Sequence, residues 1–130
     1  MTPAQGNLRE ASFRRLFPVQ VARALAAQLA IAVSLVHSQG IVHGDIHSGS
    51  ILVKLDSTLD HLSVDQFREE YGKPEIVPIR RVDGQPLPPN VPSHAVMPLY
   101  LGKKAQDFTL DDARGLVLSD FGEAFAPGTE

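Results

Sequence analysis

The stretch Val19 to Ser38 constrains the fold of this 130-residue chain more than any other feature, because it contains neither glycine nor proline. Pro18 precedes it, and proline suits the first turn of a helix, where its missing N–H would have no partner. Gly40 follows it and is a typical helix end. Apolar residues fall on nearly every face, which predicts a buried helix. The stretch is almost long enough to span a membrane, but polar residues interrupt it, so we expect no membrane insertion.

A polar loop between two apolar runs follows this helix, within Ile41 to Val53. The β-branched residues at both ends predict short strands. The loop gathers two histidines, two glycines and a carboxylate, and loops on a rigid scaffold often carry function. The candidate catalytic residues in this loop are Asp45, His43 and His47, and Ser50 closes it.

A second loop follows a short apolar run near the end of the sequence. Leu116 to Leu118 predicts a strand, and Ser119 then leads into Asp120, Phe121 and Gly122. Asp-Phe-Gly alone is also an ordinary turn sequence, so it gains meaning only together with the first loop.

The two loops together resemble the catalytic loop and the metal-binding Asp-Phe-Gly of protein kinases, H-R-D-L-x-x-x-N followed by D-F-G. His43, Asp45 and the whole Asp-Phe-Gly match, whereas Gly44 replaces the arginine and Ser50 the asparagine. The resemblance implies that Asp45 is the base that positions the acceptor hydroxyl. It also implies that Asp120 and Ser50 hold Mg²⁺ beside ATP. Residues Ser50, Asp120, Phe121 and Gly122 would then form the cofactor-binding part of the site.

Two simpler interpretations of the first loop remain open. Asp45 could be a turn residue that bonds to its own backbone. The pattern H-x-D-x-H, from His43 to His47, could also supply three metal ligands, although no second cluster of Cys or His offers a fourth ligand.

Most of the chain, Pro18 to Phe125, is similar to fungal kinases of the SR-protein-kinase type. VHGDIH, LSDFGEAF and the proline-rich segment between them carry this resemblance. It implies an intracellular serine/threonine kinase, cytoplasmic or nuclear, that uses ATP and Mg²⁺ and acts on protein, with Arg/Ser-rich sequences as expected substrates.

Two other functions compete with this one. Small-molecule kinases of the aminoglycoside or choline type carry a loop of the form H-G-D-x-H-x-x-N, which Gly44 and His47 fit better than they fit the protein-kinase pattern. A non-catalytic pseudokinase fragment is the other alternative. The 130 residues contain no glycine-rich phosphate loop, no V-A-I-K strand and no A-P-E, so we expect a partial C-lobe that is inactive alone.

The expected organisation is an α+β fold with one partial kinase-like C-lobe. A polar segment covers residues 1–17, the partial C-lobe residues 18–125, and a truncated tail residues 126–130. Within the lobe, the long buried helix leads into the catalytic-loop strands, and residues 54–115 form a long irregular spacer. In this spacer Ser63 and Gln66 predict a capping box and Gly72 a helix end. We also expect a strand in Val96 to Leu101 and a helical turn in Phe108 to Ala113.

Composition excludes several function classes. The chain has no cysteine, which excludes a disulfide framework and thiol catalysis. Its formal net charge is −3 with both signs interspersed, so no basic patch favours a nucleic-acid partner.

Overall fold

A computed structural model of the protein describes residues 3–55 and 59–128. It contains helices and two small antiparallel sheets, which confirms the predicted α+β class. The chain divides into two compact units, one from residues 1–58 and 101–130 and one from residues 59–100. Residues 1–2 of the expected N-terminal segment, 56–58 of the spacer and 129–130 of the tail lie outside the described residues.

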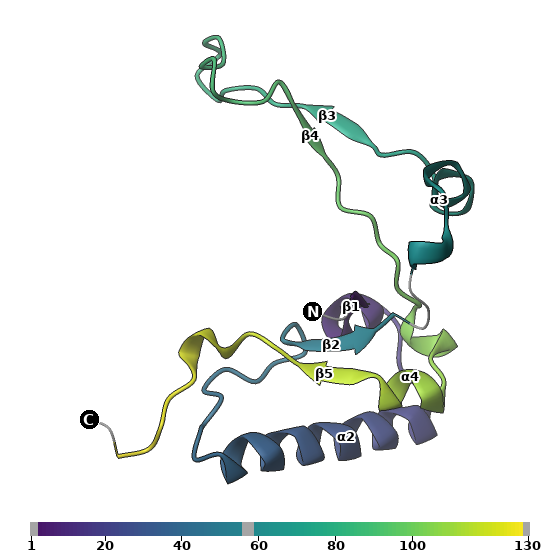
Figure 1. Ribbon diagram of the computed structural model, residues 1–130, viewed down its shortest axis with the longest axis vertical. Coiled ribbons are helices and arrows are strands. Elements are labelled where there is room, and N and C mark those ends of the chain that lie inside the picture. Colours follow the sequence, from purple (N-terminus) through teal and green to yellow (C-terminus); the bar gives the residue numbers. More distant parts are fainter. Residues whose placement is uncertain (1–2, 56–58, 129–130) are drawn as a thin grey trace. The chain divides into compact units, whose positions relative to one another are not determined.

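The first unit is built on a three-stranded antiparallel sheet with the order β1-β2-β5 (Figure 1). Strand β1 is Ala4–Asn7, β2 is Ile51–Lys54 and β5 is Leu116–Leu118. The pattern of apolar residues predicted β2 and β5. It did not predict β1, whose sequence AQGN is poor in strand-forming residues. The edge of β2 provides the hydrogen-bond partners that make β1 extended, so this strand depends on a contact distant in sequence.

Helix α2 has the bounds that the sequence predicted, Val19–Ser38, but its predicted burial on all sides is wrong. Only Val21 and Leu25 are buried, and Ile31 and Leu35 are 53% and 64% exposed. The helix contacts α4 (Leu110–Arg114) and β5, so neighbours cover a single stripe of its surface. Figure 1 shows α2 running along β5, with its opposite side uncovered within this unit.

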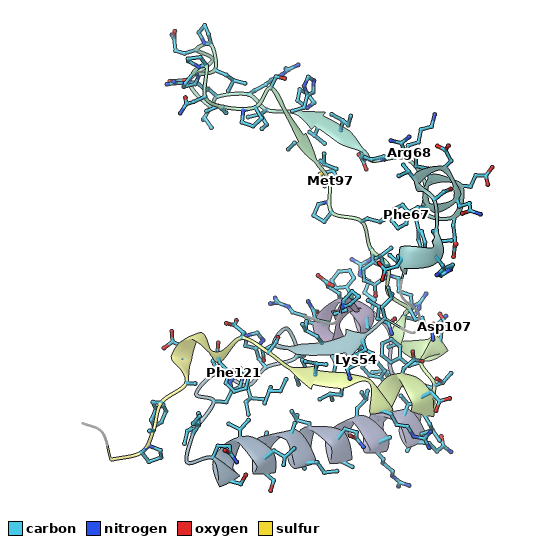
Figure 2. All side chains as sticks on the ribbon, in the orientation of Figure 1. Lys54, Phe67, Arg68, Met97, Asp107 and Phe121 are labelled. Atoms are coloured by element: carbon cyan, nitrogen blue, oxygen red, sulfur yellow. The ribbon has the colours of Figure 1, made fainter. Side chains whose placement is uncertain are left out.

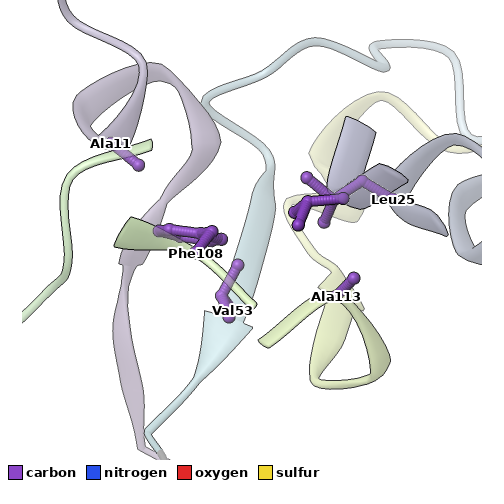
Figure 3. Close-up of a cluster of buried hydrophobic side chains, with 6 residues drawn as sticks. Ala11, Leu25, Val53, Phe108 and Ala113 are labelled. Atoms are coloured by element: carbon purple, nitrogen blue, oxygen red, sulfur yellow. The ribbon is translucent and has the colours of Figure 1, made fainter. Parts of the chain in front are cut away.

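The core of the first unit lies between the sheet, α1 (Leu8–Ala11), α2 and α4. Its buried members come from five separate segments: Ala11, Val21, Leu25, Val53, Phe108 and Ala113 (Figure 3). Phe17 extends the cluster by packing its ring edge against Phe108, with 5.1 Å between the ring centroids. Burial of these side chains is the main force that holds the helices against the sheet.

A buried polar network supports the same unit. The Asp112 carboxylate accepts hydrogen bonds from Lys103 Nζ at 2.8 Å, from the backbone N–H of Thr109 at 2.7 Å and from Gln5 Nε2 at 3.3 Å. Gln5 also donates to the carbonyl of Lys54. The network therefore connects β1, β2, α4 and the segment that leads into α4, and it compensates the cost of burying a charge.

The second unit consists of a helix and a hairpin. Helix α3 is Val64–Tyr71, and it has the predicted capping box between Ser63 and Gln66 and the predicted end at Gly72. Strands β3 (Ile76–Pro78) and β4 (His94–Val96) pair antiparallel. The expected strand in Val96 to Leu101 is therefore wrong except at its first residue. No residue of 59–100 is buried among those described, so this unit has no hydrophobic core of its own.

Helix α2 is long and apolar enough to cross a membrane by length and composition, and it is the single helix of this kind among the described residues. This observation is weak evidence, because core helices and signal sequences share these properties. In the structure, its buried stripe faces α4 and β5.

Candidate functional site

The two loops singled out by the sequence lie against each other. Val42 and Phe125 exchange backbone hydrogen bonds of 2.8 and 3.0 Å. At the other end, the backbone N–H and the hydroxyl of Ser119 both donate to the carbonyl of Ser50, at 2.9 and 2.8 Å. These contacts bring the Asp45 loop and the Asp120 loop together, as a shared site requires.

His43 is the buried link between the loops, with 1% of its surface exposed. Its Nε2 donates to the carbonyl of Ser119 at 2.8 Å, and its Nδ1 accepts from the backbone N–H of Asp45 at 3.3 Å. This pattern assigns the Nε2–H tautomer, since a carbonyl can only accept. Because both ring nitrogens are engaged and the ring is buried, His43 holds the two loops together, and its predicted catalytic role stays a prediction.

Gly44 lies in very close contact with the second loop. A Cβ built on Gly44 would lie 2.3 Å from the carbonyl oxygen of Glu123, and the φ angle of +83° is also unfavourable for other residues. The arginine of the protein-kinase pattern would not fit here without moving the two loops apart. The close packing of the two loops therefore requires glycine at position 44 in place of the arginine of the protein-kinase pattern.

Asp45 is more than half exposed and faces His47. The carboxylate oxygen Oδ2 lies 3.5 Å from His47 Nε2, and 54% of the Asp45 side chain is exposed. Asp45 can therefore reach a molecule in solution, as a residue that positions an acceptor hydroxyl must.

Ser50 is buried, and its hydroxyl is used inside the loop. It donates to the carbonyl of His47 at 2.8 Å and accepts from the His47 backbone N–H at 3.1 Å. These two bonds use the hydrogen and one lone pair of the hydroxyl, so one lone pair is left for a metal ion. The predicted role of Ser50 as a metal ligand stays a prediction, whereas its role in closing the loop is directly visible.

The Asp-Phe-Gly segment follows β5 in an unusual conformation. Asp120 is exposed and has a left-handed backbone, with φ 63° and ψ 66°, which few residues other than glycine adopt. The Phe121 ring, labelled in Figure 2, packs on the His43 imidazole with 4.6 Å between centroids. A Cβ on Gly122 would lie 3.6 Å from Asp120 Oδ1, so the Asp120 carboxylate extends back over Gly122. His43 thus anchors Phe121 while Asp120 remains accessible.

The described residues contain no group of three His, Cys, Asp or Glu side chains that could hold a metal ion. The side chains of His43, Asp45 and His47 therefore do not form such a group in this structure. Mg²⁺ is commonly held by only one or two protein carboxylates together with water and substrate phosphates. An exposed carboxylate such as Asp120 is compatible with that kind of site.

The chain matches no protein-family model, no curated protein and no solved structure. A kinase assignment therefore depends on the residues of the two loops and on their geometry.

Sequence reasoning missed two contacts of the first loop. The backbone N–H of Arg9, in α1, donates to the carbonyl of Ser48 at 3.1 Å, and no sequence pattern marks this contact. Gly49 is so close to the His47 ring that a Cβ would lie 2.9 Å from His47 Cε1. The sequence shows a glycine at position 49, but it does not show that the His47 ring is the neighbour that requires it.

An open apolar groove of about 240 Å³ lies elsewhere in the first unit. Its walls include Leu8, Phe17, Leu25, Leu29 and Leu116. None of the predicted site residues lines it, so it is separate from the two loops.

Proposed function

We propose that the two loops form the acceptor and metal side of a protein-kinase-type site, which transfers the γ-phosphoryl group of ATP to serine or threonine hydroxyls of a protein. The observation that carries this proposal is the placement of His43. It connects both loops from a buried position and leaves Asp45 and Asp120 exposed, one on each loop.

The chemistry assigns one task to each carboxylate. Asp45 orients the acceptor hydroxyl and takes its proton as the hydroxyl oxygen bonds to the γ-phosphorus. The bond from the γ-phosphorus to the bridging oxygen breaks, and ADP leaves with that electron pair. Asp120 would hold Mg²⁺, and the ion would supply positive charge beside the phosphates. Phosphoryl transfer depends almost entirely on such positioning and charge stabilisation.

These 130 residues supply only part of such a site. They contain no glycine-rich loop to cover the phosphates and no V-A-I-K strand to provide the usual lysine. We therefore expect negligible transfer by residues 1–130 alone. Strong transfer requires the rest of the cleft from further residues of a longer protein or from another chain.

The first experiment measures ATP binding by the 130-residue chain with and without Mg²⁺. We expect weak binding that Mg²⁺ strengthens and that Asp120→Asn abolishes. Asp107→Asn is the matched control, because Asp107 is an exposed carboxylate on a different segment. Binding that does not depend on Mg²⁺ or on Asp120 would contradict the proposed metal role.

The second experiment measures phosphate transfer from labelled ATP to an Arg/Ser-rich peptide, using the chain and any longer reading frame that contains it. In the longer protein Asp45→Asn should lower the rate by about 100-fold or more. Robust transfer by residues 1–130 alone would overturn the argument from the incomplete cleft.

Gly44 favours a second candidate function, a small-molecule kinase. The loop of such enzymes carries glycine between the histidine and the aspartate, and the close contact with Glu123 requires glycine here. Aminoglycosides and choline, offered as acceptors beside the peptide, distinguish the two candidates. Phosphorylation of a small acceptor but not of the peptide would establish the second one.

A further inference from the structure

We propose that His47 is the positioning residue of Asp45, and that Gly49 and Ser50 fix the orientation of its ring. This inference rests on the proposed function, since it gives Asp45 the orientation that an acceptor hydroxyl needs. The sequence indicated His47 as a candidate catalytic residue but did not indicate its role. The hydrogen bonds of its ring indicate one.

The two nitrogens of the His47 ring have different partners. Nδ1 accepts from the backbone N–H of Gly49 at 3.0 Å and from that of Ser50 at 3.2 Å. Two donors at Nδ1 require it to carry no hydrogen, so the ring hydrogen of the neutral form lies on Nε2. The Nε2 that carries this hydrogen lies 3.5 Å from Asp45 Oδ2, which is the distance of an ion pair.

The loop backbone holds the ring in this orientation. The Ser50 hydroxyl bonds to both the N–H and the carbonyl of His47, which fixes the residue at its backbone. Gly49 leaves the space in which the ring lies, because a Cβ there would be 2.9 Å from Cε1 and 3.0 Å from Nδ1. A side chain at position 49 would therefore displace the ring without removing any polar group.

This arrangement separates the two oxygens of the Asp45 carboxylate. Oδ2 faces His47, while Oδ1 has no hydrogen-bond partner among the residues that the structure describes. The acceptor hydroxyl would then meet Oδ1, with the carboxylate plane restrained by the imidazole. An Asp45 without this restraint would sample several rotamers, and misplacement of a reacting group is costly in rate.

The alternative is that His47 only closes a surface turn, since 48% of its side chain is exposed. The two roles differ in what happens at Asp45. A turn-closing histidine would affect the loop backbone, whereas a positioning histidine controls the Asp45 carboxylate. Gly49 makes this distinction testable, because its substitution moves the ring alone.

The experiment uses nitrogen and carbon NMR of the whole chain at neutral pH without ATP. We expect His47 as a single Nε2–H tautomer in the wild type. His47→Ala and Gly49→Ala should shift the Asp45 carboxyl resonance alike, and the double variant should match His47→Ala. His47→Gln keeps an N–H donor and should restore part of the wild-type shift. Ser48→Ala, an exposed neighbour, is the control and should leave Asp45 unchanged.

An Asp45 resonance that His47→Ala leaves unchanged would overturn the proposal, and so would a Gly49→Ala effect that persists fully without His47. In a preparation with Asp45-dependent transfer, His47→Ala should lower kcat by roughly 10- to 100-fold and leave the KM for ATP unchanged. A kcat unaffected by His47→Ala would also overturn it. Absence of transfer by a longer protein that supplies the rest of the cleft would contradict the proposed function, while the NMR result would still decide whether His47 positions Asp45.

Discussion

His43 Nε2 donates a 2.8 Å hydrogen bond to the carbonyl of Ser119, a residue 76 positions away in the sequence. Both groups belong to loops that carry a candidate site carboxylate. Because the His43 ring is buried, its removal would leave a cavity and would leave the Ser119 carbonyl without this partner. The contact between the two loops thus depends on a buried side chain.

Replacement of His43 should therefore destabilise the first unit. We expect His43→Ala to lower the free energy of unfolding by about 2–4 kcal/mol, from the lost hydrogen bond and the cavity. His37→Ala, at the exposed end of α2, should change it by less than about 0.5 kcal/mol. Urea unfolding followed by circular dichroism measures both. Equal effects of the two substitutions would contradict the linking role of His43.

Substitutions of Gly44 and Gly40 can be compared to test the close contact between the two loops. Both have a positive φ, +83° and +70°, but a Cβ on Gly40 would meet nothing within 4 Å. Gly40→Ala should cost about 1 kcal/mol from backbone strain alone. Gly44→Ala adds the collision with Glu123 and should cost about 1–3 kcal/mol more. Unfolding midpoints of the two variants test this, and a Gly44→Ala effect no larger than that of Gly40→Ala would rule out the close approach.

Asp112 should be a principal source of stability in the polar network. Asp112→Asn keeps the side-chain size but removes the charge that faces Lys103, so we expect a loss of about 2–4 kcal/mol at pH 7. The neighbouring Asp111 has an exposed side chain paired with Arg114, and Asp111→Asn should cost less than about 0.5 kcal/mol. Denaturant titrations of the two variants compare buried and exposed carboxylates on one helix.

The same carboxylate predicts how stability depends on pH. Burial alone would raise the pKa of Asp112, but hydrogen bonds from Lys103, Thr109 and Gln5 outweigh burial and hold the pKa below its usual value. A pKa that is lower in the folded state gives stability that is present above the unfolded pKa of about 3.9 and is lost as pH falls through the folded pKa. The stability difference between wild type and Asp112→Asn should therefore be constant from pH 5 to 7 and shrink below pH about 4. A difference that grows in acid would contradict the sign of this shift.

Helix α2 offers a test of its one-sided burial. Leu25 is 5% exposed and Leu35 is 64% exposed, although both lie on the same helix. Leu25→Ala should cost about 2–5 kcal/mol and Leu35→Ala less than about 0.5 kcal/mol. Similar large costs for both would mean that the outer face of α2 is covered in solution.

The sequence by itself determined the elements whose signals are local. The bounds of α2 follow from Pro18 and Gly40, and those of α3 from the capping box of Ser63 and Gln66. Strands β2 and β5 follow from short runs of apolar residues. These signals suffice because helix caps and propensities act between residues a few positions apart. The candidate site residues could also be named from the sequence, because the spacing of residues in a motif does not depend on the fold.

Only the tertiary structure decided which surfaces and atoms are covered. The apolar sequence of α2 could not tell that Ile31 and Leu35 lie outside, because coverage depends on where α4 and β5 pack. The strand character of β1, the buried position of His43 and the engagement of the Ser50 hydroxyl have the same origin. Each depends on residues distant in sequence or on the exact path of a loop. The sequence therefore identifies these residues, whereas their burial and hydrogen bonds in the folded chain determine what each of them does.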